Sequence, residues 1–194
     1  MKPKIGLLIL NLVLMILLSS CYPYMQDQVL SEWPKYVPAQ GSNISFAGIA
    51  PPAADSCSVH AVDLLGAWVS AATPETDPFP FTDTSGKQCQ GTFEADILPL
   101  FSQANLWYAG APSCRTCHGP DVQVSYARMD LSSYQGILAG SSRDSVDTTG
   151  EDILGGGNWE ASGLYDALTK GEMPPSQPAG ANPQGLIVNA GSSK

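Results

Sequence analysis

The sequence predicts a small, mainly α domain with long irregular segments on both sides of it. Three stretches have the apolar spacing of amphipathic helices, at residues 58–72, 93–103 and 158–170. No run of alternating apolar and polar residues is long enough to predict a series of strands. The 194 residues include 16 Pro and 19 Gly, which favour long loops around one modest core. The expected domain spans residues 57–175.

The N-terminus has the pattern of an export signal. Two lysines precede an apolar stretch over residues 5–18, which is shorter than the roughly 20 residues that a membrane-spanning helix needs. Residues 18–21 read Leu-Ser-Ser-Cys, which resembles the lipobox of bacterial lipoproteins. We therefore expect residues 1–20 to be a cleaved signal peptide and Cys21 to carry acyl chains that anchor the protein to the membrane. The alternative is an uncleaved signal anchor.

Residues 21–56 and 176–194 are expected to be irregular extensions. The first is rich in proline and has no sustained period, so we interpret it as a tether that lifts the domain away from the lipid. The second contains mostly small, polar or proline residues and is expected to lie along the surface as a C-terminal tail. The chain has 9 basic and 18 acidic residues and a net charge of -9, which excludes a nucleic-acid binder.

The clearest helix is expected at residues 58–72. Asp55 or Ser56 can cap its start, and Pro74 ends it. Its apolar residues recur every three or four positions and form one buried face: Ala61, Leu64, Leu65, Trp68, Val69 and Ala72. Residues 73–92 are rich in Pro, Thr, Asp and Gly and are expected to form a loop.

Two shorter helices are expected further along the chain. The first covers residues 93–103 and has its apolar residues on one side. The second runs from Asn158 as N-cap to Lys170 and is followed by Gly171, a residue type that commonly ends helices. Together with the helix at 58–72 they predict a helical core.

The chemistry of the chain is concentrated in residues 114–118, Cys-Arg-Thr-Cys-His. Two cysteines separated by two residues and followed directly by histidine form the attachment pattern of haem c. In this pattern both sulfurs bond to the haem vinyl groups and the histidine binds the iron. We therefore expect one covalent haem c on Cys114 and Cys117, with His118 as an iron ligand.

Two other uses of these cysteines compete with haem attachment. A thioredoxin-type redox motif is disfavoured because the βαβ pattern expected around it is missing. A zinc site needs a second pair of ligands at suitable spacing, which Cys57, Cys89 and His60 do not provide.

An electron-transfer haem needs a sixth iron ligand, and Met173 is the best candidate. It follows the helix that ends at Lys170 and precedes two prolines. These prolines stiffen the loop, which suits a weak thioether ligand. Met129 and His60 are the fallback ligands. The competing interpretation of Met173 is a methionine that fills a gap in the core.

Cys57 and Cys89 remain after Cys21 takes lipid and the motif cysteines take haem. In an exported protein a disulfide between them is the expected state. It would close a loop of about 32 residues and stabilise the fold by about 3 to 4 kcal/mol in the chain-entropy model. The alternative is two free buried thiols.

The haem motif lies within a longer stretch, residues 93–175, in which a helix, the motif, a second helix and a Met-Pro-Pro loop follow one another. This order resembles a mono-haem class I c-type cytochrome. The resemblance implies a few helices around one haem whose edge stays open for electron exchange. Members of that family usually end in a further helix, which the helix at 58–72 resembles. We therefore expect a circular permutation in which it packs against residues 93–101 and 159–169, pinned by the disulfide.

These features predict an electron carrier rather than an enzyme, since no Ser-His-Asp or paired-carboxylate arrangement is evident. We expect it on the periplasmic face of the bacterial cytoplasmic membrane, anchored through Cys21. Its layout resembles the mono-haem lipoprotein subunit of alternative complex III. The resemblance implies a subunit of a quinol-oxidising respiratory or photosynthetic complex that passes electrons to a soluble acceptor. The alternative is a haem enzyme or gas sensor with an open sixth iron position.

Overall fold

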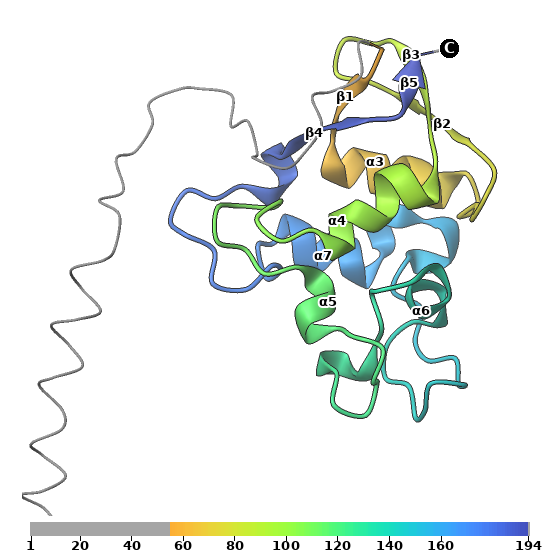
Figure 1. The fold of residues 1–194 in the computed structure, drawn as a ribbon, viewed down its shortest axis with the longest axis vertical. Coiled ribbons are helices and arrows are strands. Elements are labelled where there is room, and N and C mark those ends of the chain that lie inside the picture. The colour runs from red at the N-terminus through yellow and green to blue at the C-terminus, as the bar shows by residue number, and fades with distance from the viewer. Residues whose placement is uncertain (1–54, 194) are drawn as a thin grey trace, which may run out of the picture. The chain divides into compact units, whose positions relative to one another are not determined.

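The structure is a computed structural model that describes residues 55–193 (Figure 1). The signal peptide expected at residues 1–20, the lipidation of Cys21 and almost all of the tether expected at residues 21–56 lie outside the described residues. Across residues 55–193, no helix combines the length and the apolar character that crossing a membrane requires.

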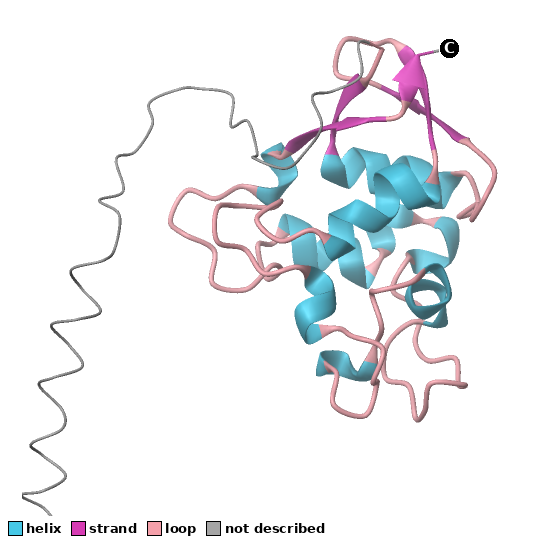
Figure 2. Cartoon of the chain, viewed as in Figure 1, coloured by secondary structure: helices cyan, strands magenta, loops and turns pink. Residues whose placement is uncertain are grey.

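Short helices and short strands alternate with long loops in this part of the chain (Figure 2). Its α-helices are α3 (Ala61–Ser70), α4 (Leu98–Ser102), α5 (Cys114–Cys117), α6 (Tyr134–Ala139) and α7 (Gly163–Thr169). Single turns of other helix types are η1 (Phe93–Ile97), η2 (Tyr126–Arg128), η3 (Gly155–Gly157), η4 (Trp159–Ala161) and η5 (Pro183–Gly185). The strands are β1 (Cys57–His60), β2 (Phe79–Thr82), β3 (Gln88–Gly91), β4 (Ile187–Ala190) and β5 (Ser192–Ser193).

Local side-chain caps start two of the helical segments that the sequence predicts. The Thr92 hydroxyl accepts a hydrogen bond from the N–H of Ala95 at 3.4 Å, where η1 begins and runs on into α4. The Ser162 hydroxyl accepts from the N–H of Tyr165 at 3.0 Å and starts α7, so the helix expected from Asn158 begins with a separate turn, η4.

Strands at one end of the domain make the fold a mixed α/β arrangement. β1 pairs antiparallel with β4, with Cys57 opposite Ala190, and β3 lies between β2 and β5 in a second antiparallel sheet. The prediction of a mainly α, class I cytochrome fold, permuted or not, is therefore wrong. Residues 187–193, which the sequence assigned to a surface tail, supply β4 and β5.

The strands are too short to be recognised from sequence. None exceeds four residues, so none shows a sustained period of two. In β2 the buried Phe79 and Phe81 do alternate with exposed neighbours, but Pro80 between them argues against a strand. Ser58 of β1 and Asn189 of β4 are 131 residues apart, so tertiary structure alone brings them together.

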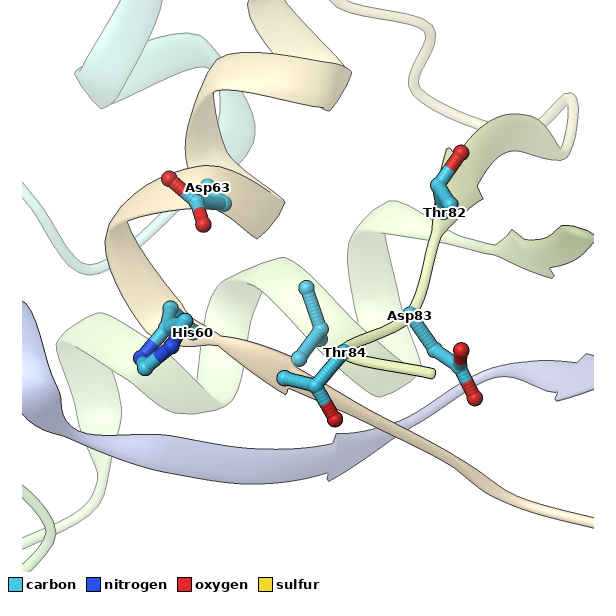
Figure 3. Close-up of a pocket in the computed structure, with 6 residues that line it drawn as sticks. His60, Asp63, Thr82, Asp83 and Thr84 are labelled. Atoms are coloured by element: carbon cyan, nitrogen blue, oxygen red, sulfur yellow. The ribbon is translucent and has the colours of Figure 1, made fainter. Parts of the chain in front are cut away.

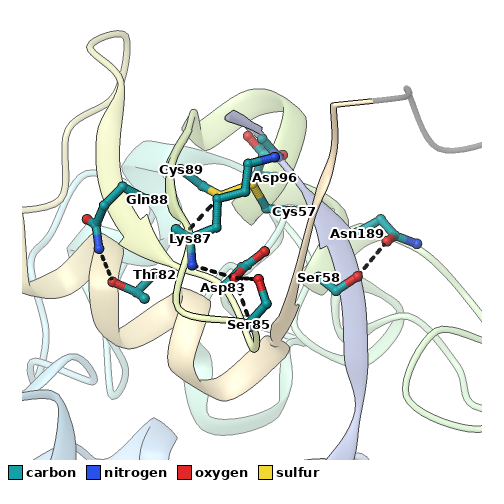
Figure 4. Close-up of a disulfide and its surroundings, with 11 residues drawn as sticks. Cys57, Ser58, Thr82, Asp83, Ser85, Lys87, Gln88, Cys89, Asp96 and Asn189 are labelled. Carbon is teal, nitrogen blue, oxygen red and sulfur yellow. Dashed lines mark hydrogen bonds between the residues drawn. A yellow bond between two sulfur atoms is a disulfide. The ribbon is translucent and has the colours of Figure 1, made fainter. Parts of the chain in front are cut away.

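A disulfide between Cys57 of β1 and Cys89 of β3 joins the two sheets, and both cysteines are fully buried (Figure 4). Beside it, Asp83 closes the turn between β2 and β3, because its Oδ1 accepts from the N–H groups of Ser85 and Lys87, each at 2.8 Å. Hydrogen bonds from the Ser85 hydroxyl and the Lys87 N–H lower the pKa of Asp83. The disulfide and the hydrogen bonds of Asp83 thus stabilise the end of the domain that contains the strands.

Helix α3 places one apolar face in the core. Its buried residues are Ala61, Val62, Leu64, Leu65, Trp68 and Val69. Trp68 packs against Phe93 of η1 with ring centroids 5.4 Å apart. A Cβ added to Gly66 would lie 2.6 Å from Cδ1 of Trp159 in η4, so only glycine allows this close approach. The helix therefore meets the segments that the sequence predicted as its neighbours, although the fold around it is mixed.

Candidate haem site

A cavity of about 750 Å³ lies between α4, α5, α7 and the loops that follow them. This volume is within the range of cofactor pockets. Most of its wall is apolar and includes Phe101, Trp107, Pro112, Leu131, Ile153, Leu164, Ala167, Leu168, Pro174 and Pro175. The wall also contains Cys114, Cys117, His118, Tyr126, Met129 and Met173. The motif residues and the methionine loop therefore meet at one apolar cavity.

Helix α5 presents both motif cysteines to this cavity. Cys114 and Cys117 are three positions apart, so one helical turn brings their side chains to the same face. Both are free thiols. Burial raises the pKa of Cys114 to about 11, so this thiol stays protonated at neutral pH. Two thiols on one side of a helical turn are the groups that form the thioethers of haem c.

His118 follows α5 and lines the cavity with a buried ring, 6% exposed. Its Nδ1 lies 2.8 Å from the carbonyl oxygen of Tyr126. Because a carbonyl only accepts hydrogen bonds, Nδ1 carries the proton of the neutral ring, which leaves the Nε2 lone pair for a metal. The carbonyl of His118 accepts from the N–H of Leu131 at 2.8 Å. The backbone therefore fixes both the position and the tautomer of this imidazole.

Two methionines line the cavity, Met129 and Met173. Met129 is tied to the backbone next to His118, because the Ser125 hydroxyl contacts both the Met129 carbonyl and, at 3.3 Å, the Cys117 carbonyl. Met173 comes instead from the loop after α7. Met129 and His118 thus belong to one hydrogen-bonded segment, whereas Met173 belongs to a separate element that reaches the same cavity, and Met173 would be the residue that holds an iron together with His118.

The Met173 loop is anchored before and after the methionine. The Met173 N–H donates to the Ala167 carbonyl at 3.0 Å, and the Tyr108 hydroxyl donates to the Pro175 carbonyl. The Met173 side chain is 37% exposed, so hydrogen bonds to the backbone, rather than burial of the side chain, fix this loop. A fixed loop suits a thioether ligand, whose weak bond to iron cannot order its own segment.

His60, the other fallback ligand, is not part of this site. It lines a separate cavity of about 280 Å³ together with Asp63 and Thr84 (Figure 3). That cavity lies at the end of the domain that contains the strands, where β1 leads into α3. Of the three candidate sixth ligands, only the two methionines reach the large cavity.

The cavity residues fit haem c better than the two competing uses of the cysteines. Zinc needs four donors that converge on one point. Within residues 55–193, the one group of three or more such donors within 4.8 Å is Cys57, Asp83 and Cys89, and its two sulfurs form the disulfide. A thioredoxin-type motif needs neighbouring strands, and between β3 and β4 the described chain has none. An imidazole with a free Nε2 beside two thiols matches covalent haem attachment.

Several contacts at the site had no signal in the sequence. The Tyr126 carbonyl that orients His118 is a backbone group, which any residue type supplies. Tyr108 and Pro175 are 67 residues apart, so their hydrogen bond depends on the tertiary structure. Trp107, whose Nε1 donates to the Leu100 carbonyl at 2.8 Å, is distinguishable in sequence only as an apolar residue.

Comparison with known proteins assigns no family to this chain. No family model matches it, and no curated protein matches it. The cavity and the residues that line it are therefore the basis for a functional assignment.

Proposed function

We propose that this protein is an electron-transfer cytochrome with one haem c bound covalently through Cys114 and Cys117. His118 and Met173 hold the iron. The observation that carries the proposal is the meeting of two thiols, a thioether loop and an imidazole with a free Nε2 at one apolar cavity. Neither a zinc site nor a thioredoxin-type motif would use all of these groups.

When bound, haem c supplies a one-electron couple between ferrous and ferric iron. The hydrogen bond to the Tyr126 carbonyl holds His118 in one orientation, so its ring need not turn when the charge beside Nε2 changes. The bonds from Tyr108 and to Ala167 hold the Met173 loop in the same way. The apolar wall disfavours additional positive charge, and together with thioether ligation this favours the reduced state and a raised potential.

We propose a carrier rather than an enzyme because the cavity wall offers little for general acid-base catalysis. Among the described residues that line the cavity, His118 is the one histidine and there is no carboxylate. In the proposed site the Nε2 lone pair of His118 would be used by the iron and its Nδ1 proton is held by a carbonyl, so this histidine would not be free to exchange a proton in general acid-base catalysis. A haem enzyme or gas sensor with an open sixth position is the alternative, and replacement of Met173 separates the two.

The proposed site of action is the periplasmic face of the bacterial cytoplasmic membrane. The lipobox-like sequence ending at Cys21 supports an acyl anchor. The disulfide between Cys57 and Cys89 suits an oxidising compartment. There the protein would be a subunit of a quinol-oxidising respiratory or photosynthetic complex and would pass electrons to a soluble acceptor.

The test is to produce the full-length chain in a bacterium that attaches haem c and to look for covalent haem. We expect a peroxidase-active band on a denaturing gel and an intact mass increased by one haem. Replacing Cys114 and Cys117 together by alanine removes both thioethers and abolishes the band, whereas Met129→Leu keeps it. A wild-type chain that is exported and folded but carries no covalent haem would contradict the proposal.

The identity of the sixth ligand is tested by optical spectroscopy of two matched variants. Met173→Leu removes the thioether and is expected to eliminate the low-spin spectrum of the reduced protein. Met129→Leu removes the other methionine of the cavity wall and is expected to leave that spectrum unchanged. If Met173→Leu changes nothing, the open-site alternative gains support.

A further inference from the structure

We propose that the exposed apolar side chains of Val124, Tyr126 and Val146 form a docking surface for a redox partner protein with a basic surface. We call these three residues the apolar patch. The inference rests on the proposed electron-transfer function and adds to it the place and the charge of the partner.

All three side chains are unusually exposed for apolar residues. The exposed fractions are 82% for Val124, 71% for Tyr126 and 56% for Val146. Single exposed apolar residues are common on protein surfaces, but a group of them on one face marks an interaction site.

Hydrogen bonds join the two loops that carry the apolar patch. The Gln123 side-chain amide donates to the Asp144 carbonyl at 2.5 Å, and the Ser142 N–H donates to the Ala127 carbonyl at 2.8 Å. Arg128 and Asp144 form an ion pair at 3.2 Å. In Figure 1 both loops lie at the end of the domain opposite the strands. The patch residues therefore belong to one side of the molecule.

The apolar patch is directly connected to the candidate haem site. Tyr126 and Ala127 line the large cavity, and the Tyr126 carbonyl accepts the hydrogen bond from His118. The residue that orients the iron ligand through its backbone thus exposes its side chain to solvent. A protein bound here would lie against the wall of the cofactor cavity, where electron transfer has only a short distance to cover.

Charge decides which class of partner fits. The chain has a net charge of -9. On the two loops Arg128 is paired with Asp144, and Arg143 is buried and donates to the carbonyls of Thr148 and Val146. The exposed charges without an ion-pair partner there are Asp121 and Asp147. A second copy of this chain or an anionic membrane surface would be repelled, whereas a basic protein would be attracted and would bury the apolar patch.

The experiment measures electron transfer from the reduced, full-length protein in detergent to a soluble basic cytochrome c by stopped flow. The test variant combines Val124→Ser with Val146→Ser, and Tyr126 is left intact because it also lines the candidate haem cavity. The control is Ile187→Ser, which replaces an apolar residue that is 53% exposed on β4, at the opposite end. We expect the double variant to lower the second-order rate about fivefold and the control to leave it unchanged.

Two further measurements make the outcome decisive. The rate should fall with rising salt and should be lost with a succinylated probe whose lysine charges are reversed. Equal rates in the double variant and the control, or equal rates with both probes, would overturn the proposal. So would self-association, or binding to vesicles of anionic lipid, that the double variant abolishes.

The absence of haem and the absence of a docking surface can be distinguished by experiment. If the wild-type chain carries no haem, binding of the basic cytochrome to the immobilised protein still reports on the apolar patch, because that measurement needs no cofactor in this chain. Loss of this binding in the double variant but not in Ile187→Ser supports the docking surface even then. Equal binding in both variants rejects it.

Discussion

Residues 57–91 and residues 113–131 are stabilised by different kinds of interaction. In the first region, antiparallel pairing, the disulfide and the Asp83 turn satisfy polar groups and bury apolar ones within the chain. In the second, α5 and η2 border a cavity of about 750 Å³ whose wall is mostly apolar. Uncovered apolar surface of this kind lowers stability. The part of the domain that contains the strands is thus held by bonds within the chain, whereas the part that contains the cavity would be completed by the proposed haem.

The proposed function would account for this difference. A redox site must hold its cofactor rigidly, and the proposed haem would itself complete the packing of α5, α7 and the Met173 loop. The disulfide holds β1, and β1 leads directly into α3, whose Trp68 packs on Phe93. The disulfide therefore gives α3 a fixed support.

Omitting the cofactor should loosen residues 113–131 far more than residues 57–91. In protein produced without haem attachment, amide exchange in residues 113–131 and 163–175 should be about a hundredfold faster than in the loaded protein, because these segments lose the packing that covers the cavity wall. Exchange in β1, β3 and α3 should change little. Hydrogen exchange with mass spectrometry measures both regions at once. Equal protection of the two regions from exchange in the haem-free protein would show that residues 113–131 do not depend on haem more than residues 57–91 do.

Removing the disulfide should weaken the opposite end. Replacing Cys57 and Cys89 together by alanine opens a loop closed over 32 residues and should lower the free energy of unfolding by about 3 to 4 kcal/mol. Denaturant titration of the loaded protein measures this. Haem content at low temperature should be unchanged, since neither cysteine lines the cavity. A variant that folds but loses haem would show that the two ends are not separable.

The alkaline stability of the haem-free protein should depend on Cys114. Burial raises its pKa from 9.0 to about 11, so between these values the unfolded chain releases a proton that the folded chain retains. Stability is complete below pH 9 and should fall by about 2 to 3 kcal/mol as pH rises to 11. Denaturant titrations across this range measure the loss. It should be absent in Cys114→Ala and in the loaded protein, where the sulfur is a thioether and does not titrate.

The smallest effect is expected for Tyr108→Phe. This change removes the hydroxyl that holds the Pro175 carbonyl and should cost about 1 kcal/mol, equivalent to a roughly fivefold rise in the affinity of added imidazole for the ferric iron. Optical titration with imidazole measures the competition with Met173. Tyr165→Phe, on the neighbouring helix α7, is the matched control and should leave the affinity unchanged. Equal affinities in both variants would show that the hydrogen bond does not hold the ligand loop.

An element could be predicted from the sequence only where its residue pattern is long enough, or its spacing close enough, to be recognised. Helix α3 was identifiable because its apolar face repeats over three turns, and its start was misplaced only because Cys57–His60 form a strand instead. The two thiols and the imidazole were identifiable because their spacing lies within five residues. The strands were not, since each is too short for its period to be recognised and pairs with a distant segment.

From the order of residues alone, this protein has a helix built around Trp68, a Cys-x-x-Cys-His motif and an acidic surface, because each of these is a property of neighbouring residues. Tertiary structure decided that the chain is α/β, that the Tyr126 carbonyl fixes His118, and that Tyr108 anchors the Met173 loop. The physical reason is that backbone hydrogen bonds and cavity walls join groups that are far apart in the chain. The residue type at one position does not indicate which distant residue it will contact.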